Sequence, residues 1–326
     1  MNNRYDDFKT DIIDLLSRKR GGHVERWLYS DIARDEVTGS ALWSAFIRAA
    51  KNYYVLPNEV ALIENSSALL SNRFNKFDTI VDLGVGSKQS VTSKVLPIVK
   101  HATSAKNYAP VDLSKAYLRG AEEVIEANTI LDVKPTKGNF FEDDLELPGR
   151  NRLALFFGAT ISNVDAMEGE EFPQQEIIQK LGHVAGLLKN DHDNLLLASF
   201  DSNADPASIK HAYEDAHWKR FVANLSYSMD AVLDIKGNFR PSAWHHESVW
   251  DDKAKVLHHM IVASENQNFE IDGQEFDVRK GERFVAINCF KFPVEWFQDM
   301  AREAGFNVEK PYHDHQQRMV IQPLRI

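Results

Sequence analysis

TIVDLGVGS, residues 79–87, is a short β-branched run that ends in two glycines. Such a run is typical of a buried strand, and glycines directly after a strand let backbone N–H groups approach a ligand at the carboxyl edge of a sheet. The spacing is D-x-G-x-G, from Asp82 through Gly84 to Gly86, without the third glycine of the pyrophosphate fingerprint. A purely structural turn would also explain the loop taken alone.

The segments on either side of this loop alternate between strands and helices. Three more apolar runs follow, at 107–114, 152–163 and 194–202, and stretches with helical spacing of apolar residues separate them. The run LALFF within 152–163 suits a strand that is buried on both faces. This alternation predicts an α/β fold with a parallel, doubly wound sheet.

The two ends of the chain have a different character. Residues 1–61 have helical patterns, with a turn and cap signal at Thr38-Gly39-Ser40, and SALWSAFIRAAKNYYVL (40–56) is read as helical. After Asp205, the segment 208–233 is read as one or two helices, and 255–264 and 282–292 as antiparallel strands. A final helix and strand could return to the sheet.

Two domains follow from these patterns. We expect residues 62–203 and 291–326 to form the cofactor-binding domain with the parallel sheet. Residues 1–61 and 204–290 are expected to form a second α+β domain that binds the substrate.

Composition limits the classes of function. The net charge of −10 disfavours a phosphate backbone as a partner, so we expect no nucleic acid. The single cysteine, Cys289, excludes an intramolecular disulfide. No signal peptide or run of about 18 apolar residues is present, so we expect a soluble, cytoplasmic protein without membrane contact. The oligomeric state stays open.

Acidic and amide residues follow the next strands. Asp112 ends the 107–112 run, where a carboxylate can accept hydrogen bonds from both ribose hydroxyls, although it could also be the N-cap of a helix starting at Ser114. At Asn139 and Phe140 an amide and a ring could hold adenine. These residues indicate a ligand with a nucleoside part, and the missing third glycine speaks against a pyrophosphate. The sequence therefore predicts S-adenosylmethionine (SAM) as the cofactor. The predicted cofactor-binding residues are Asp82, Gly84, Gly86, Ser87, Lys88, Asp112, Leu113, Asn139, Phe140, Phe157 and Gly158.

Candidate substrate residues come from both domains. Asn163 follows FFGATIS at the carboxyl edge, where an amide can accept from an amine and donate to a carboxylate, or simply satisfy a turn. Tyr213 is placed within a helix, where its hydroxyl could bind the carboxylate or its ring could fill a helix interface. Tyr29, Tyr53 and Tyr54 are further candidates with weaker individual support.

Several segments, in order, resemble the histidine-specific methyltransferase family, which includes the trimethylhistidine-forming enzyme of the ergothioneine pathway and fungal dimethylallyltryptophan N-methyltransferases. The segments are DLGVGSKQSVTSKVL, YAPVDLS, GNF, LFFGATISN, AYEDAHWKRFVAN, WHHESVWDDKAKVLHHMIVAS and GERFVAINCFKF. The resemblance covers nearly the whole chain. It implies a Rossmann-like class I methyltransferase domain with a substrate domain, SAM as the methyl donor and no metal. It also implies that Asn163 and Tyr213 bind the amino and carboxylate groups of a free amino acid.

The chain departs from the histidine enzymes at the ring of the substrate. Those enzymes have a glutamate and a serine that bind the imidazole ring, and this chain has Ile287 and Cys289 at the same two positions. Both side chains are expected on one face of a strand, because side chains alternate along a strand. An alkyl group in place of the carboxylate leaves an imidazole N–H unsatisfied, at a cost of about 1–3 kcal/mol. His258 and His259 replace a glutamate-methionine pair, and we expect His259 to line the site. We therefore expect an aromatic amino acid, tryptophan-like, with histidine as the alternative.

Two smaller differences from the family remain, and two other classes of function stay open. Asn139 stands for a usual aspartate, and Ser162 for a common glycine. A metal enzyme would need the histidines at 245, 246, 258, 259, 313 and 315, but adjacent His258 and His259 point to opposite faces, and no HExxH motif or cysteine pair is present. A non-catalytic SAM-binding protein is the other alternative.

Overall fold

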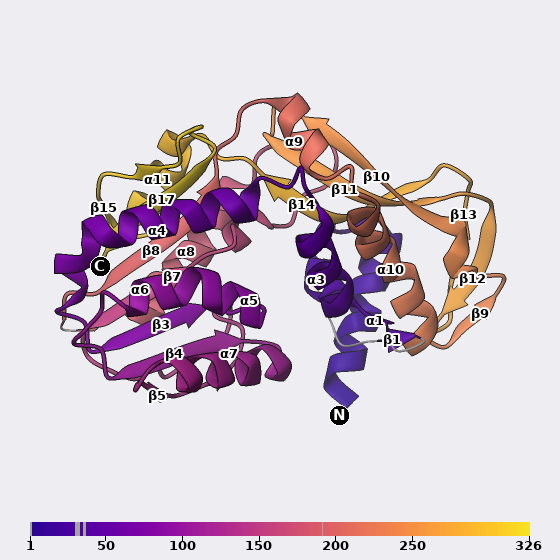
Figure 1. Cartoon of the computed structure of the whole chain (residues 1–326). Helices are drawn as coiled ribbons and strands as arrows, with labels where there is room; N and C mark the ends of the chain where they lie inside the picture. Colours follow the sequence, from indigo (N-terminus) through magenta and orange to yellow (C-terminus); the bar gives the residue numbers. More distant parts are fainter. Residues whose placement is uncertain (1, 30–32, 35–36, 191) are drawn as a thin grey trace. The chain divides into compact units, whose positions relative to one another are not determined.

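The structure is a computed structural model that describes residues 2–29, 33–34, 37–190 and 192–326 (Figure 1). The chain contacts divide it into two compact units. Unit 1 contains Met1–Tyr54, Ser162–Pro173 and Asp205–Phe290, and unit 2 contains Val55–Ile161, Gln174–Ala204 and Lys291–Ile326. These bounds differ from the expected domains at 55–61 and at residue 204, which lie in unit 2, and at 162–173, which lie in unit 1.

Unit 2 is built on one mixed sheet in the order β15-β17-β8-β7-β3-β4-β5. Strands β8, β7, β3, β4 and β5 are parallel neighbours, and β6 also pairs with β4 in parallel. The bounds are β3 (Thr79–Leu83), β4 (Asn107–Asp112), β5 (Asp132–Val133), β6 (Thr136–Lys137), β7 (Arg152–Phe156), β8 (Leu195–Asp201), β15 (Asn307–Val308), β16 (Tyr312–His313) and β17 (Met319–Arg325). The prediction of an α/β fold with a wound parallel sheet is confirmed.

The C-terminal strand closes one side of this sheet. β17 pairs antiparallel with β8 over its whole length, and β15 and β16 pair antiparallel with β17. Every residue of β3 and of β8 is buried, as expected for central strands that are covered on both faces. The sheet core therefore lies along these strands, and their carboxyl ends carry the loops of interest.

Two groups of packed helices accompany the sheet. One contains α4, α6 and α7 with the π-helical turn η1, and the other contains α8 and α11. Figure 1 shows α4 in front of the sheet. The bounds are α4 (Val55–Phe74), α5 (Lys88–Ser90), η1 (Val91–Val95), α6 (Leu96–Val99), α7 (Lys115–Asn128), the 3-10 turn η2 (Thr160–Ser162), α8 (Gln174–Leu188) and α11 (Val294–Glu303).

Unit 1 combines helices with two antiparallel sheets and a short strand pair. One sheet has the order β10-β11-β14 and the other β13-β12-β9. The helices are α1 (Asn2–Leu16), α2 (Glu25–Leu28), α3 (Gly39–Ala49), α9 (Pro206–Ala212), α10 (Ala216–Val232) and the 3-10 turn η3 (Pro241–Ala243). The strands are β1 (Ala33–Arg34), β2 (Val37–Thr38), β9 (Ile235–Gly237), β10 (Trp244–Asp251), β11 (Val256–Ala263), β12 (Gln267–Ile271), β13 (Gln274–Val278) and β14 (Arg283–Phe290).

The helical reading of 40–56 as one stretch is wrong. Thr38 caps α3, since its side chain accepts a hydrogen bond from the backbone N–H of Ala41, but α3 ends at Ala49 and α4 begins at Val55. Pro57 explains the break, because proline fits the first turn of a helix but not its interior, where its ring meets the preceding turn. The new helix belongs to unit 2, which moves the unit boundary to Val55.

Within the described part of the chain, none of the helices combines the length and the apolar character that a bilayer crossing requires.

Candidate functional site

The loop after β3 requires glycine for its backbone conformation. Gly84 has φ +79° and Gly86 has φ +67°, in the left-handed region that other residues rarely adopt. A Cβ placed on Gly84 would lie 3.6 Å from Cε1 of Phe140, so the strain comes from φ rather than from crowding. The loop therefore brings its backbone to the strand tips beside Phe140, one of the predicted cofactor residues.

Asp112 links the tips of β3 and β4. One carboxylate oxygen accepts from the backbone N–H of Ser114 at 2.7 Å, and the other from that of Gly86 at 3.4 Å. Ser114, not Asp112, caps α7. Burial raises the pKa of the Asp112 carboxyl, while these backbone hydrogen bonds lower it. Leu113 beside it is 45% exposed, although it is a large apolar residue.

Asp82 lies below this loop in the core of the sheet. It is buried and accepts a hydrogen bond from the hydroxyl of Tyr108 at 2.6 Å. Burial raises the pKa of the Asp82 carboxyl to about 6, against the lowering effects of Tyr108 and of the Lys94 charge. Asp82 is therefore largely ionised at pH 7, at a marked desolvation cost.

The remaining predicted residues on these loops have defined local partners. Ser87 caps α5 by accepting from the N–H of Ser90, and the Lys88 ammonium pairs with Glu123 on α7. The Asn139 side chain accepts from the N–H of Phe141 at 3.0 Å and donates to Glu142 at 2.8 Å. Both interactions of Asn139 order its own loop.

A buried ion pair contacts the loop after β7, and the sequence did not predict it. Glu59 on α4 pairs with the Lys94 ammonium at 2.5 Å, and its side chain is 1% exposed. The other Glu59 oxygen accepts from the N–H of Gly158 at 2.6 Å and from the hydroxyl of Ser199. Gly158 has φ +89° and directly follows the buried Phe157, so the hydrogen bond from Gly158 to Glu59 fixes the backbone of this loop. Lys94 within a helical, mostly apolar stretch was the signal available in the sequence.

In unit 1, Asn163 lies beside a carboxylate that sequence reasoning missed. Its amide nitrogen donates to Oε1 of Glu25, in the first turn of α2, at 3.4 Å. Both residues are half-buried. The two positions are separated by 138 residues, so no local pattern predicts their contact.

Most of the candidate tyrosines of unit 1 meet in one aromatic cluster. The prediction that Tyr213 lies within a helix is wrong, because Tyr213 is the C-cap residue of α9. Asp215 then starts α10 by accepting a hydrogen bond from the N–H of His217. The buried Tyr213 ring lies 5.5 Å from Tyr53 and 4.7 Å from His259 by ring centroids. The aromatic cluster comprises Tyr29, Trp43, Phe46, Tyr53, Tyr213, Trp218, Phe221 and His259.

Hydrogen bonds fix the protonation of His259 in this cluster and of the buried His246 next to it. The indole N–H of Trp218 donates to Nδ1 of His259 at 3.2 Å, so this nitrogen is an acceptor. Nε2 of His246 lies 3.0 Å from the same atom and must donate to it. Burial lowers the pKa of His246 to about 4. Both rings are therefore neutral, with the proton on Nε2.

Ile287 and Cys289 lie along β14 as predicted for one face of a strand. Ile287 is opposite His259 and Cys289 is opposite Leu257 on β11, and both side chains are buried. The neighbouring His258 instead contacts Asn288, its Nδ1 lying 2.7 Å from Oδ1. Tyr54, the remaining candidate, is buried at the end of the first segment of unit 1.

Across the described ranges 2–29, 33–34, 37–190 and 192–326, no three histidine, cysteine, aspartate or glutamate side chains gather in a way that could hold a metal ion.

The chain is similar to several known proteins. Over 243 residues it is 26% identical to protein y4iF of Sinorhizobium fredii, covering 72% of this chain and 76% of that protein. Over 333 residues it is 22% identical to the N-methyltransferase imqF of Aspergillus flavus, covering 94% and 86%. A solved S-adenosylmethionine-dependent methyltransferase from Clostridium acetobutylicum aligns at 13% identity and a TM-score of 0.44, covering 87% of this chain and 96% of that one.

The strand tips of unit 2 fit a SAM molecule by their chemistry. Asp112 offers partly buried carboxylate acceptors suited to hydroxyl donors, and Leu113 exposes an apolar side chain next to it. The loop of Gly84 and Gly86 leaves room where other residues carry a Cβ. Residues 8–325 match the family described as "Histidine-specific methyltransferase, SAM-dependent". The chain therefore belongs to the histidine-specific, SAM-dependent methyltransferase family, with SAM as its cofactor.

Proposed function

We propose that the protein is an Nα-methyltransferase of free amino acids that prefers an aromatic, tryptophan-like substrate to histidine. The observation that carries this preference is the buried strand β14, where Ile287 and Cys289 lie beside the neutral His259. An apolar wall with neutral imidazoles offers an imidazole substrate no carboxylate partner, and it suits an apolar ring with one polar edge.

In this proposal unit 2 holds the methyl donor. Asp112 accepts hydrogen bonds from the ribose, Leu113 and Phe140 pack against adenine, and the backbone of Gly84 and Gly86 borders the ligand. Bound SAM supplies an electrophilic methyl group on a sulfonium. The Glu59–Lys94 pair keeps the loop at Gly158 in place.

Unit 1 holds the amino acid in this proposal. Asn163 binds the amino group, Tyr213 binds the carboxylate, and Tyr29, Tyr53 and Tyr54 complete the site. An α-amine is largely protonated at neutral pH, so the residues that hold it must let one proton leave to water before nitrogen can react. Orientation of that nitrogen by fixed side chains is the main contribution that the chain can make to the rate.

The substrate preference is tested by methyl transfer to a panel of amino acids, followed by mass spectrometry. We expect L-tryptophan to be methylated with a kcat/KM at least tenfold above that of L-histidine, because the missing imidazole acceptor costs about 1–3 kcal/mol. The family description favours histidine as the second candidate, and a clear preference for it would refute the proposed preference. A protein that binds S-adenosylhomocysteine but no amino acid would be a non-catalytic member.

SAM affinity should weaken in acid. SAM carries a sulfonium and an ammonium, so it binds the ionised form of Asp82 better, and protons compete with it as the pH falls through about 6. From pH 8 to pH 5 we expect roughly a tenfold loss of affinity from Asp82, and Asp112, whose pKa is also raised, acts in the same direction.

Calorimetry at a series of pH values measures this dependence. The Asp82→Asn variant is neutral at every pH, so it should bind SAM more weakly at pH 8 and lose the Asp82 part of the slope. A wild-type affinity that stays constant from pH 8 to pH 5 would contradict a cationic ligand near these carboxylates.

A further inference from the structure

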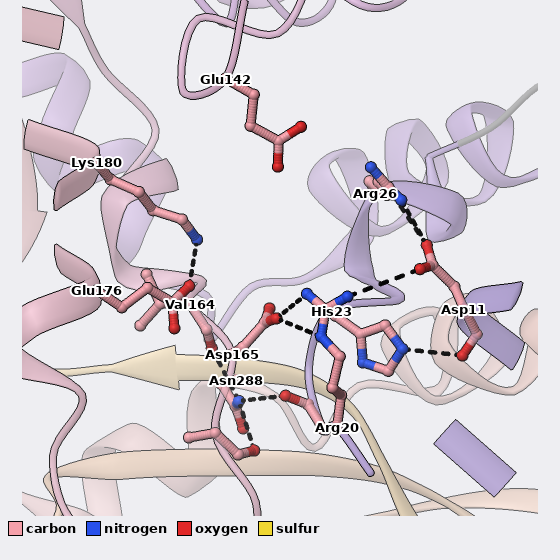
Figure 2. A network of polar contacts seen from close by, with 12 residues as sticks. Asp11, Arg20, His23, Arg26, Glu142, Val164, Asp165, Glu176, Lys180 and Asn288 are labelled. Carbon is pink, nitrogen blue, oxygen red and sulfur yellow. Dashed lines mark hydrogen bonds and ion pairs between the residues drawn. The ribbon is translucent and has the colours of Figure 1, made fainter. Parts of the chain in front are cut away.

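A buried amide in unit 1 organises the chain segment that follows Asn163 (Figure 2). The side-chain nitrogen of Asn288 donates to the carbonyl oxygens of Val164 at 2.9 Å and of Ala166 at 3.0 Å. Its oxygen meets Nδ1 of His258, which must therefore be the donor. Asn288 is 1% exposed, so these hydrogen bonds are sheltered from water. The position of residues 164–166 is thereby fixed from β14.

A second set of contacts joins this segment to residues 20–22. The Ala166 N–H donates to the Gly21 carbonyl at 2.9 Å, and Nε of Arg20 donates to the carboxylate of Asp165 at 3.1 Å. Gly22 is at φ +87°, and a Cβ there would lie 2.3 Å from the Asn288 side-chain nitrogen. Only glycine lets the chain pass this close to the amide.

Asp11 fixes the residues that flank the start of α2, as Figure 2 shows. Its side chain accepts from Arg26 at 2.7 Å and from the indole of Trp27 at 2.6 Å, and its carbonyl oxygen lies 2.9 Å from Nε2 of His23. Burial lowers the pKa of His23. The backbone on both sides of Glu25 is therefore held from α1.

This network places Glu25 and Asn163 together. Asn163 directly precedes Val164, Glu25 directly precedes Arg26, and the Asn163 amide nitrogen donates to the Glu25 carboxylate at 3.4 Å. Because the amide nitrogen of Asn163 faces Glu25, the amide oxygen, which can accept hydrogen bonds, points away from Glu25. The pair thus combines acceptor oxygens with a negative charge. Such a combination attracts an ammonium group and repels a carboxylate.

We propose that Glu25 is a substrate-binding residue that recognises the positive charge of the amino acid's α-ammonium group, with Asn163 as its partner. The inference rests on the proposed function. It makes the presence of an α-ammonium group, rather than the side chain alone, a condition for tight binding. It also assigns the network around Asn288 and Asp11 the role of positioning this pair.

The test is calorimetry on the whole protein saturated with S-adenosylhomocysteine, with L-tryptophan and 3-(indol-3-yl)propionate, which lacks the amino group. We expect the wild type to bind L-tryptophan at least tenfold more tightly than the analogue. Glu25→Gln should weaken L-tryptophan binding roughly ten- to hundredfold, the size of a lost charge-assisted contact, and leave the analogue nearly unchanged. Glutamine can still accept the hydrogen bond from Asn163, so a purely structural role would not produce this difference.

Two further variants control for fold and net charge. Glu275→Gln removes the same charge at an exposed position on β13 of the same unit and should behave like the wild type. Glu25→Asp keeps the charge and should retain most of the discrimination. Equal binding of L-tryptophan by Glu25→Gln and the wild type, or equal binding of both ligands by the wild type, overturns the inference.

Failure of the proposed function gives a different result. In that case the wild type with S-adenosylhomocysteine would bind neither L-tryptophan nor L-tyrosine nor L-histidine. A wild type that methylates L-histidine alone refutes only the aromatic preference, and the Glu25 comparison then uses L-histidine and its des-amino analogue.

Discussion

Replacing Asp112 by alanine should reduce SAM affinity by a factor of a hundred or more. A partly buried carboxylate that accepts hydrogen bonds from ligand hydroxyls contributes about 1.5–3 kcal/mol for each such bond, and alanine removes both acceptors. Asp112 also receives the N–H groups of Ser114 and Gly86, so its loss leaves the tips of two strands without a common acceptor. Fluorescence titration or calorimetry with SAM measures the effect.

Matched variants separate ligand binding from loop structure. Asp112→Asn keeps one oxygen for the Ser114 N–H but removes the charge, so we expect an intermediate affinity. Asp132→Ala removes an exposed carboxylate from the neighbouring strand β5 and should bind SAM like the wild type. If Asp112→Ala binds SAM normally, the ribose site lies elsewhere.

The sequence predicts the sheet of unit 2 well, and the reason is local. Buried central strands are continuous apolar runs, and Gly84 and Gly86 mark the end of β3 because only glycine tolerates their backbone angles. The alternation of side chains along β14 likewise predicts that Ile287 and Cys289 share a face.

The sequence predicts the contacts of the candidate site poorly, since they join residues far apart in the chain. Glu59 and Gly158 are 99 residues apart, and Glu25 and Asn163 are 138 apart, so neither pair follows from periodicity. The helix end at Tyr213 was predictable in principle, because Asp215 is a strong helix N-cap residue. The tautomers of His246 and His259 required the position of Trp218.

Replacing Lys94 by methionine should destabilise the protein by about 3–5 kcal/mol, because it leaves the Glu59 charge buried without its partner. Urea unfolding of wild type and variant measures this. Lys88→Met is the matched control, since the Lys88–Glu123 pair is exposed on both sides, and its unfolding midpoint should stay close to that of the wild type.

The double variant Glu59→Gln/Lys94→Met tests whether charge or packing is responsible. Glutamine can still accept from the Gly158 N–H and carries no charge, so the double variant should recover much of the stability that Lys94→Met loses. If the loss of stability in the double variant equalled the sum of the losses in Glu59→Gln and Lys94→Met, the two residues would not be a coupled pair. Because Glu59 also fixes the loop at Gly158, the double variant should bind SAM better than Lys94→Met at equal urea concentration. That result would connect the buried ion pair to the cofactor loop, a link that stability measurements alone do not provide.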